Sequence, residues 1–369
     1  MSPPTAAAAA PPSQTRLKPI AFDDLPGWRD DDHAAALAAF GRGSAVLAAH
    51  PPKRRALGID AAALADRLAR AERLGGSDSA GARAFFEAEF APFEVTPAGG
   101  AFFTGYYEPE VAGSLVPTPR FGVPLYRTPD DLVEIAPGGC PAGIAEGVRF
   151  ARKTGRGLTE YPDRAAIEAG FLTGRGLELV YVEDPVDAFF IHVQGAARVR
   201  LADGRVLRVT YAAKNGHPYT PIGRVLIEMG ALKRDKVTMA AIRAWLAAHP
   251  REAGAAMAKN RSYIFFREAP VDDPVLGPIA AAKVPLTAGR SLAVDRGQLS
   301  FHTPVWIDTT LPDGRAWRRL MIAQDTGSAI VGPARGDIFF GSGEAAGAVA
   351  GAMQAGGRFV VLAPRGAAR

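Results

Sequence analysis

The chain has 369 residues, of which 48% are hydrophobic and 22% are charged. This length exceeds one average domain, so we expect two domains, or one domain with a large insertion, around a well-packed core. The net charge of +5 favours anionic partners. The chain contains no basic run interleaved with aromatic residues, so we do not expect it to bind nucleic acid. A membrane span is not expected either, because no stretch of about 18 consecutive apolar residues occurs.

The first 20 residues, rich in alanine and proline, are expected to form a disordered leader. This start lacks the basic flank and leucine-rich run of a secretory signal, and it shows no cysteine that could carry a lipid. The only cysteine, Cys140, lies in the turn-forming sequence APGGCP. A lone cysteine builds neither a disulfide framework nor a thiolate metal site. We expect no metal and no cofactor.

Apolar residues recur at three- and four-residue spacing early in the chain, which predicts amphipathic helices at 33–49, 61–74 and 80–90. From residue 102 onward, short runs of β-branched and aromatic residues are broken by Gly, Pro and Asp, a pattern typical of strands. Strands are predicted at 177–182, 188–193, 197–201, 206–211, 263–266, 305–307, 320–323 and 359–362. Two predicted helices, at 222–229 and 238–249, interrupt this part and precede a natural domain boundary.

The motif FTGYYEP at 103–109 places Thr104, Tyr106 and Tyr107 near a predicted strand end. Aromatic faces with hydroxyl tips suit stacking against sugars, so this edge is a candidate binding site. In the alternative interpretation, one tyrosine packs inward and the other caps the sheet. The pattern alone does not decide between the two.

Two further segments carry candidate binding groups. In FFIHVQGA at 189–196, strand alternation would place His192 and Gln194 on one face, although a lone histidine is more often structural than catalytic. The polar segment at 211–223 contains Lys214, Asn215 and His217 beside Gly and Pro. Such a segment suits a fixed ligand-binding loop, and the alternative is a solvated turn leading into the helix at 222.

The segment LMIAQDTGSAIVGPARGDIFFGSG at 320–343 places Asp325 and Asp337 in glycine-rich turns between apolar runs. A carboxylate that a rigid scaffold lifts out of water can donate a proton near neutral pH. Both aspartates are also compatible with ordinary turn chemistry. No serine-hydrolase elbow, phosphate-binding loop, zinc-peptidase motif or dinucleotide fingerprint is present, which disfavours those enzyme classes.

These segments, with SYIFF at 262–266 and SLAVDR at 291–296, occur in the order typical of the membrane-bound lytic murein transglycosylase A family. The sequence resembles that family over about two thirds of its length. The resemblance implies a mainly β fold with N-terminal helices. It implies a larger double-psi β-barrel domain at 21–108 and 259–369, a smaller β-domain inserted at 109–258, and a glycan groove between them.

The resemblance also implies a C-terminal three-aspartate module, matched by Asp295, Asp325 and Asp337. Asp337 takes the position of the catalytic acid, and the other two support it. The implied reaction cleaves the bond between N-acetylmuramic acid and N-acetylglucosamine in peptidoglycan, with the muramoyl C6 hydroxyl closing a 1,6-anhydro ring. A hydrolytic glycosidase usually needs two carboxylates. Here one acid suffices, because the substrate supplies the nucleophile.

The residues expected to bind the glycan are Thr104, Tyr106, Tyr107, Gln194, Lys214, Asn215 and His217. Ala196 stands where the family often has serine, so one sugar hydrogen bond is expected to be missing or replaced. Peptidoglycan strands are the expected partner of a monomeric, periplasmic protein, with outer-membrane association and contacts to cell-wall synthesis or division proteins as options.

Two other functions stay open. One is a non-catalytic, expansin-like glycan-binding module, and the other is a muramidase with two carboxylates. The product distinguishes the three: anhydro ends for the transglycosylase, reducing ends for the muramidase, and binding without cleavage for the module.

Overall fold

The computed structural model describes residues 15–136, 143–144 and 148–366, which form two compact units. Unit 1 draws on Met1–Phe103, Arg290–Asp337 and Gln354–Arg369, and unit 2 on Thr104–Gly289 and Ile338–Met353. The predicted boundaries at 108/109 and 258/259 differ from this division. It assigns 259–289 and 338–353 to unit 2, which thereby holds the longer share of the chain. Cys140 lies outside the described residues.

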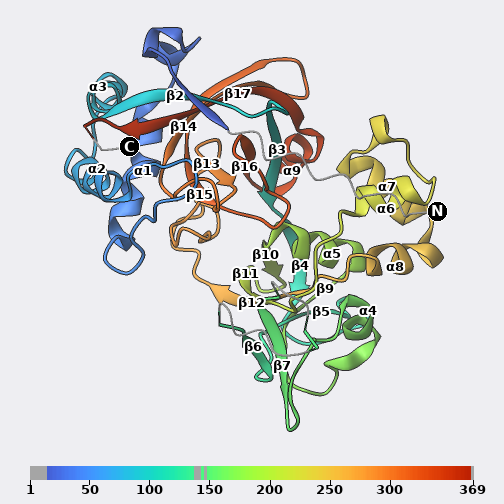
Figure 1. Cartoon of the computed structure of the whole chain (residues 1–369). Helices are drawn as coiled ribbons and strands as arrows, with labels where there is room; N and C mark the ends of the chain where they lie inside the picture. Colours follow the sequence, from blue (N-terminus) through green and yellow to red (C-terminus); the bar gives the residue numbers. More distant parts are fainter. Residues whose placement is uncertain (1–14, 137–142, 145–147, 367–369) are drawn as a thin grey trace, which may run out of the picture. The chain divides into compact units, whose positions relative to one another are not determined.

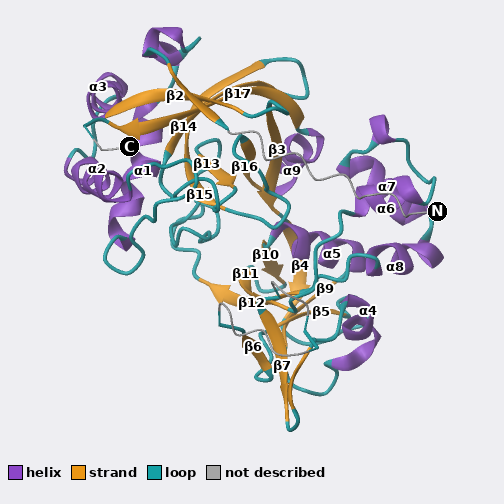
Figure 2. Cartoon of the chain, viewed as in Figure 1, coloured by secondary structure: helices purple, strands orange, loops and turns teal. Residues whose placement is uncertain are grey.

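An eight-stranded sheet with the order β1-β2-β17-β14-β15-β13-β16-β3 forms the framework of unit 1 (Figure 2). An additional pairing between β17 and β3 closes six of these strands into a ring. The division into units falls inside β3 and β16, so both strands contribute residues to each unit. The strands are β1 (Arg16–Pro19), β2 (Phe90–Thr96), β3 (Ala101–Glu108), β13 (Ser291–Val294), β14 (Pro304–Thr310), β15 (Ala316–Asp325), β16 (Arg335–Ser342) and β17 (Gln354–Pro364).

Three N-terminal helices pack against this sheet, at the blue end of the chain in Figure 1. Each begins after an aspartate, Asp32, Asp60 or Asp78, whose carboxylate accepts a hydrogen bond from a first-turn amide, as expected of helix caps. Their apolar faces bury Phe40 in one core with Trp306 of β14. The helices predicted at 33–49, 61–74 and 80–90 are thus confirmed as α1 (His33–Gly41), α2 (Ala61–Arg73) and α3 (Ser79–Glu89), the first ending earlier than predicted.

The prediction of a disordered leader over residues 1–20 is wrong at its C-terminal end. Strand β1 pairs antiparallel with β2, and Leu17 lies opposite Val95. Composition misled here, because the Ala/Pro run ends before the short segment RLKP, whose backbone adds an edge strand to the sheet. Residues 1–14 lie outside the described part of the chain.

Unit 2 contains a six-stranded sheet with the order β12-β11-β10-β4-β9-β5 and a three-stranded sheet, β6-β7-β8. The strands are β4 (Glu110–Ser114), β5 (Val123–Tyr126), β6 (Leu132–Glu134), β7 (Phe150–Thr154), β8 (Gly157–Thr159), β9 (Glu178–Val182), β10 (Ala196–Leu201), β11 (Val206–Lys214) and β12 (Ile264–Ala269). The helices are α4 (Arg164–Ala166), α5 (Pro185–Gln194), α6 (Ile222–Glu228), α7 (Met239–Ala248), α8 (Pro250–Ala258) and α9 (Gly343–Ala352). The helices predicted at 222–229 and 238–249 are confirmed as α6 and α7, and the fold is mainly β with helices, as expected.

The prediction of a strand at 188–193 is wrong, because this segment lies in helix α5. Asp184 accepts a hydrogen bond from the amide of Val186 at 2.8 Å, Pro185 occupies the first turn, and Gly195 ends the helix with φ +85°. The helix is buried around most of its circumference, so its sequence shows no polar stripe that would reveal the helical period. Residues two apart on a helix point about 200° apart, and His192 and Gln194 therefore do not share a face.

Candidate functional site

The three aspartates of the predicted module lie at or next to the ends of neighbouring strands of unit 1. Asp325 is the last residue of β15 and pairs with Ala293 of the parallel strand β13. Asp295 comes directly after β13, and Asp337 is the third residue of β16, the other neighbour of β13 in the sheet. All three side chains are half-buried. The fold therefore collects them from three adjacent strands.

Asp295 fixes the loop that leads to Asp337. Its Oδ1 accepts a hydrogen bond from the amide of Gly297 at 2.8 Å, within its own turn. Its Oδ2 accepts another from the amide of Gly332 at 2.8 Å. Gly332 lies in the loop between β15 and β16, so the carboxylate of Asp295 ties this loop to the end of β13.

Asp325 stands beside a buried polar contact that the sequence did not reveal. Its own Oδ1 accepts a hydrogen bond from the amide of Thr326 at 2.9 Å. The preceding Gln324 is fully buried, accepts from the Ser291 hydroxyl at 2.6 Å and donates to the Ala39 carbonyl at 2.7 Å. These bonds join β15 to β13 and to helix α1, and they fix the strand end that carries Asp325.

Arg335 is the residue near Asp337 that the sequence reasoning missed. Residues 335 and 337 point to the same face of β16, because side chains alternate along a strand. The guanidinium lies 5.2 Å from the centre of the Phe102 ring, which is 43% exposed. Burial lowers the pKa of Arg335, and the charge of Asp337 raises it. A guanidinium in turn favours the ionised form of a nearby carboxylate, so Arg335 opposes protonation at this position.

The two tyrosines of the FTGYYEP motif take different environments. Tyr106 is half-buried, and its ring packs on Phe339 of β16 with centroids 5.3 Å apart. Tyr107 is buried against helix α9, where Gly347 leaves room for its ring: a Cβ at that position would lie 2.7 Å from it. One tyrosine of the pair thus packs inward, as in the alternative interpretation. Thr104 lies on the same face of β3 as Tyr106 and is half-buried.

Tyr107 and Gln194 contact each other within unit 2. The amide of Tyr107 donates to Oε1 of Gln194 at 3.2 Å. Burial raises the pKa of Tyr107, while a hydrogen bond with Arg243 lowers it. Arg243 also pairs with Asp187 at 2.7 Å, so the polar tip of Tyr107 ends in a charged cluster.

Asn215 organises the backbone of the predicted binding loop. Its side-chain nitrogen Nδ2 donates to the carbonyls of Pro162 and Arg261, both at 3.0 Å. Its Oδ1 accepts from the amide of Tyr263 at 2.9 Å. The side chain is buried, so these bonds use its polar atoms to join three segments of unit 2.

The neighbours of Asn215 are placed differently. Lys214, the last residue of β11, is half-buried, whereas His217 is buried with Nε2 at 2.6 Å from the Tyr161 carbonyl. The loop is therefore held by its own side chains, and Lys214 is the most accessible of the three. The roles of Lys214, Asn215 and His217 in glycan binding stay predictions.

His192 is a buried structural residue of α5. Its Nδ1 lies 3.0 Å from Nη1 of Arg164, and burial together with this positive charge holds the pKa of His192 well below its ordinary value. Arg164 is itself buried and donates to the carbonyls of Asn260 and Ser262 at 3.0 and 2.8 Å. His192 is thus neutral and acts as an acceptor for Arg164.

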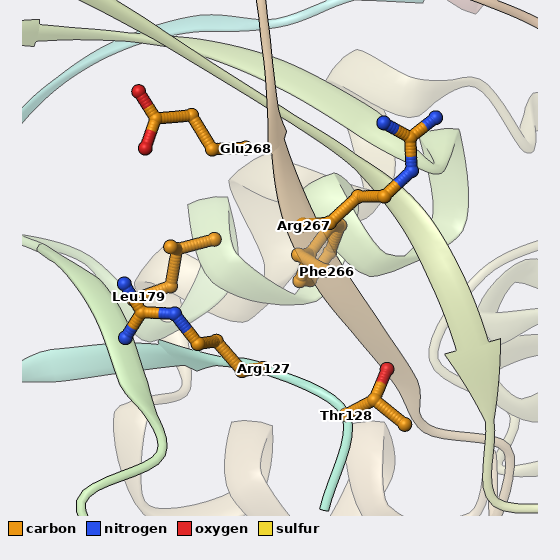
Figure 3. A pocket seen from close by; sticks show the side chains of 6 residues that line it. All are labelled: Arg127, Thr128, Leu179, Phe266, Arg267 and Glu268. Atoms are coloured by element: carbon orange, nitrogen blue, oxygen red, sulfur yellow. The ribbon is translucent and has the colours of Figure 1, made fainter.

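A pocket of about 320 Å³ lies on unit 2, and none of the predicted site residues lines it (Figure 3). It is lined by Arg127, Thr128, Leu179, Phe266, Arg267 and Glu268. Arg267 and Glu268 leave β12 on opposite sides, and Arg127 is fixed by a 2.9 Å hydrogen bond to the Glu178 carbonyl. In the described part of the chain, no group of three or more His, Cys, Asp or Glu side chains is arranged to hold a metal ion.

Comparisons with known proteins match both units. Residues 102–267 match the MltA specific insert domain, and residues 290–363 match the 3D domain. The chain is similar in structure to a membrane-bound lytic murein transglycosylase from Agrobacterium tumefaciens, with 46% identity and a TM-score of 0.88 over 95% of this chain and 98% of that one. It is also similar to MltA from Escherichia coli with bound chitohexaose, with 27% identity and a TM-score of 0.64 over 96% and 93% of the two chains.

Among curated proteins, the membrane-bound lytic murein transglycosylase A of Escherichia coli K12 is 34% identical over 272 residues, which are 72% of this chain and 66% of that protein. Fold and site thus define a two-unit, mainly β protein that combines an insert domain with a 3D domain. The chain belongs to the membrane-bound lytic murein transglycosylase A family, a family of enzymes named for their action on murein. The family resemblance seen in the sequence is confirmed.

Proposed function

We propose that this protein is a lytic transglycosylase, which cleaves the β-1,4 bond between N-acetylmuramic acid and N-acetylglucosamine and leaves 1,6-anhydro ends. The supporting observation is the placement of Asp337, which lies third in β16 within the 3D-domain match. The neighbouring strand β13 leads directly into Asp295, and β15, on the far side of β13, ends at Asp325. The family's enzymes are named for this activity.

In the proposed mechanism Asp337 acts alone as acid and base. Its protonated carboxyl donates a proton to the glycosidic oxygen as the bond from the anomeric carbon breaks. The resulting carboxylate takes the proton of the muramoyl C6 hydroxyl while that oxygen bonds to the anomeric carbon and closes the anhydro ring. Asp337 ends the cycle protonated, and no water is consumed. Positioned proton transfer of this kind typically contributes about 10²–10⁴-fold.

The charged neighbours have supporting roles in this proposal. Asp295 holds the loop before β16 through Gly332, so it would keep the backbone around Asp337 in place. Nearby carboxylates favour protonation of an acid, whereas the guanidinium of Arg335 opposes it. The balance between Asp325, Asp295 and Arg335 would set the pH at which Asp337 carries its proton.

The substrate proposed is the glycan strand of peptidoglycan. The E. coli relative was solved with bound chitohexaose, a chain of N-acetylated sugars. We propose that Thr104, Tyr106, Tyr107, Gln194, Lys214, Asn215 and His217 serve glycan binding in this chain, with the half-buried Thr104, Tyr106, Gln194 and Lys214 in direct contact and the buried ones holding the backbone. Double-psi connectivity of the strand ring and a glycan groove belong to the same proposal and rest on the resemblance.

The proposed location is the periplasm, where the substrate lies, with association to the outer membrane. It is supported by the names of the relatives, which are called membrane-bound. Among the residues that the structure describes, no helix is long and apolar enough to cross a bilayer.

The test is digestion of purified murein sacculi followed by mass spectrometry of the released products. Anhydromuropeptides from the wild type, and none from Asp337→Asn, are the expected result. Reducing-end muropeptides would instead indicate a two-carboxylate muramidase, and binding without soluble products would indicate an expansin-like module. If Asp337→Asn kept its activity, Asp325 would be the next acid to replace.

A further inference from the structure

Glu108, the acid of the FTGYYEP motif, is a fully buried carboxylate of unit 2 at the end of β3. Its side chain has 0% exposure and pairs with Arg208 at 2.7 Å and with Arg198 at 2.8 Å. Arg208 is almost completely buried as well, and its Nη2 lies 3.3 Å from Oε2 of Glu108. Two cations on one buried anion are unusual, because a buried charge is costly unless all its partners are in place.

The surplus positive charge is met by backbone carbonyls. Arg198 donates to the carbonyls of Pro274 and Leu276 at 2.8 and 3.0 Å, and Arg208 donates to Leu276 at 2.8 Å. Glu108 thereby fixes, through its two arginines, the segment at 270–277 that follows β12. Gly277, the residue after Leu276, packs so closely on Phe339 that a Cβ at position 277 would lie 2.4 Å from the ring.

The third partner of Glu108 is Ser342. The Ser342 hydroxyl donates to Oε2 of Glu108 at 2.6 Å, the shortest of the bonds to this carboxylate. Ser342 is the last residue of β16, the strand that carries Asp337. Phe339 lies on this same strand and packs on Tyr106, two residues before Glu108. The carboxylate therefore holds β16 in two ways, by a direct bond to Ser342 and through Gly277 to Phe339.

We infer that Glu108 is a positioning residue, which sets the path of β16 and so the placement of Asp337, and which acts without touching the substrate. The inference rests on the proposed function, because it concerns the site of the same acid. A strand clamped at residues 339 and 342 has little freedom two residues before the first clamp. Misplacement of a catalytic group by about 1 Å can lower a rate by about 100-fold, so a clamp of this kind should be visible in kcat.

Ser342→Ala tests the direct bond and leaves both arginines paired. We expect kcat for release of anhydro ends from soluble glycan strands to fall roughly tenfold, with KM within about twofold of the wild type. Ser342→Thr keeps the hydroxyl and should restore most of the lost rate. Ser77→Ala removes a hydroxyl that bonds only to the Leu74 carbonyl on the surface, and this control should match the wild type.

Glu108→Gln is a second test of the same inference. Its control is Glu110→Gln, because Glu110 pairs with Arg200 at the surface. If Glu108→Gln fails to fold, Ser342→Ala decides alone. A folded Ser342→Ala enzyme with wild-type kcat would overturn the inference, as would a loss that Ser342→Thr does not repair. Wild-type protein that releases no anhydro ends would instead overturn the proposed function, so the two failures are distinguishable.

Discussion

The aspartates of unit 1 and Glu108 of unit 2 show two ways of holding a carboxylate. Asp295, Asp325 and Asp337 are half-buried at neighbouring strand ends, where backbone amides and one arginine surround them. Glu108 has no exposed surface and four charged or hydroxyl contacts. The oxygens of Glu108 are occupied by two guanidiniums and a hydroxyl, whereas the half-buried aspartates keep part of their surface exposed. Chemistry and rigidity are thus assigned to different acids.

The largest effect is expected from Asp337→Asn. The amide keeps the size of the side chain but cannot donate a proton, so the rate of anhydro-end formation should fall by about 10²–10⁴-fold. The free energy of unfolding should change by less than about 1 kcal/mol, because the side chain is only half-buried. Product analysis by mass spectrometry and urea unfolding measure the two quantities. A loss of several kcal/mol of unfolding free energy in Asp337→Asn would contradict the assignment of chemistry and rigidity to different acids.

Glu108→Ala should show the opposite profile, with stability as the main loss. Removal of the carboxylate leaves the buried guanidinium of Arg208 and the partly buried one of Arg198 without an anion, which typically costs about 3–5 kcal/mol. Glu110→Ala breaks an exposed pair and should cost about 0–1 kcal/mol. Urea unfolding followed by circular dichroism compares the two variants. Equal midpoints would mean that the buried pair contributes no more than the exposed one.

Asp295→Ala lies between these extremes. It removes the acceptors of the Gly297 and Gly332 amides, so the loop before β16 loses its tie and activity should fall about tenfold. Asp313→Ala is the matched control, because Asp313 makes the same turn contact to the amide two residues on, but in solvent. Rates with soluble glycan strands check the pair, and a similar loss in both variants would argue against a specific role for the Gly332 bond.

The smallest effect is expected from Arg335→Gln, and it should appear in the pH profile. The guanidinium favours the ionised form of Asp337, so its removal should let the protonated form persist to higher pH. The alkaline limb of kcat/KM should then move upward in pH, with less than about a tenfold change at the optimum. Arg335→Lys keeps the charge and should leave the limb in place. A shift toward lower pH in the glutamine variant would show that this sign is wrong.

Much of unit 1 could be predicted from sequence because its signals are local. Helices α2 and α3 have one apolar face, α1 is rich in alanine, and each of the three has an aspartate at its start, features that can be read from neighbouring residues. Helix α5 escaped prediction because its residues are buried on most sides, which removes the polar stripe. Its start and stop signals, Asp184, Pro185 and Gly195, were present but were outweighed by the β-branched and aromatic residues between them.

The candidate site was predictable only in part, because its local signals can be read from the sequence and its long-range contacts cannot. Glycine-rich turns made Asp325 and Asp337 visible, and family resemblance singled out Asp337. Their supporting contacts join residues far apart in the chain: Glu108 meets Arg208 across 100 positions and Ser342 across 234. Such pairs arise from the order of strands in the sheets, which a local pattern does not contain. Asn215 was noticed as a polar loop residue, but its bonds to two distant backbone segments, at 162 and at 261–263, appear only in the fold.

The short bond from Ser342 to Glu108 has a consequence for the helix that follows. Ser342 occupies the N-cap position of α9, yet its side chain caps no amide of the first turn. A serine in that position usually stabilises a helix start by about 1 kcal/mol, and here the hydroxyl serves the strand instead. The first amides of α9 should therefore exchange with deuterium faster than those of the aspartate-capped α1, α2 and α3. Their exchange rates would give a local, substrate-free signal of whether the strand behind the acid is locked.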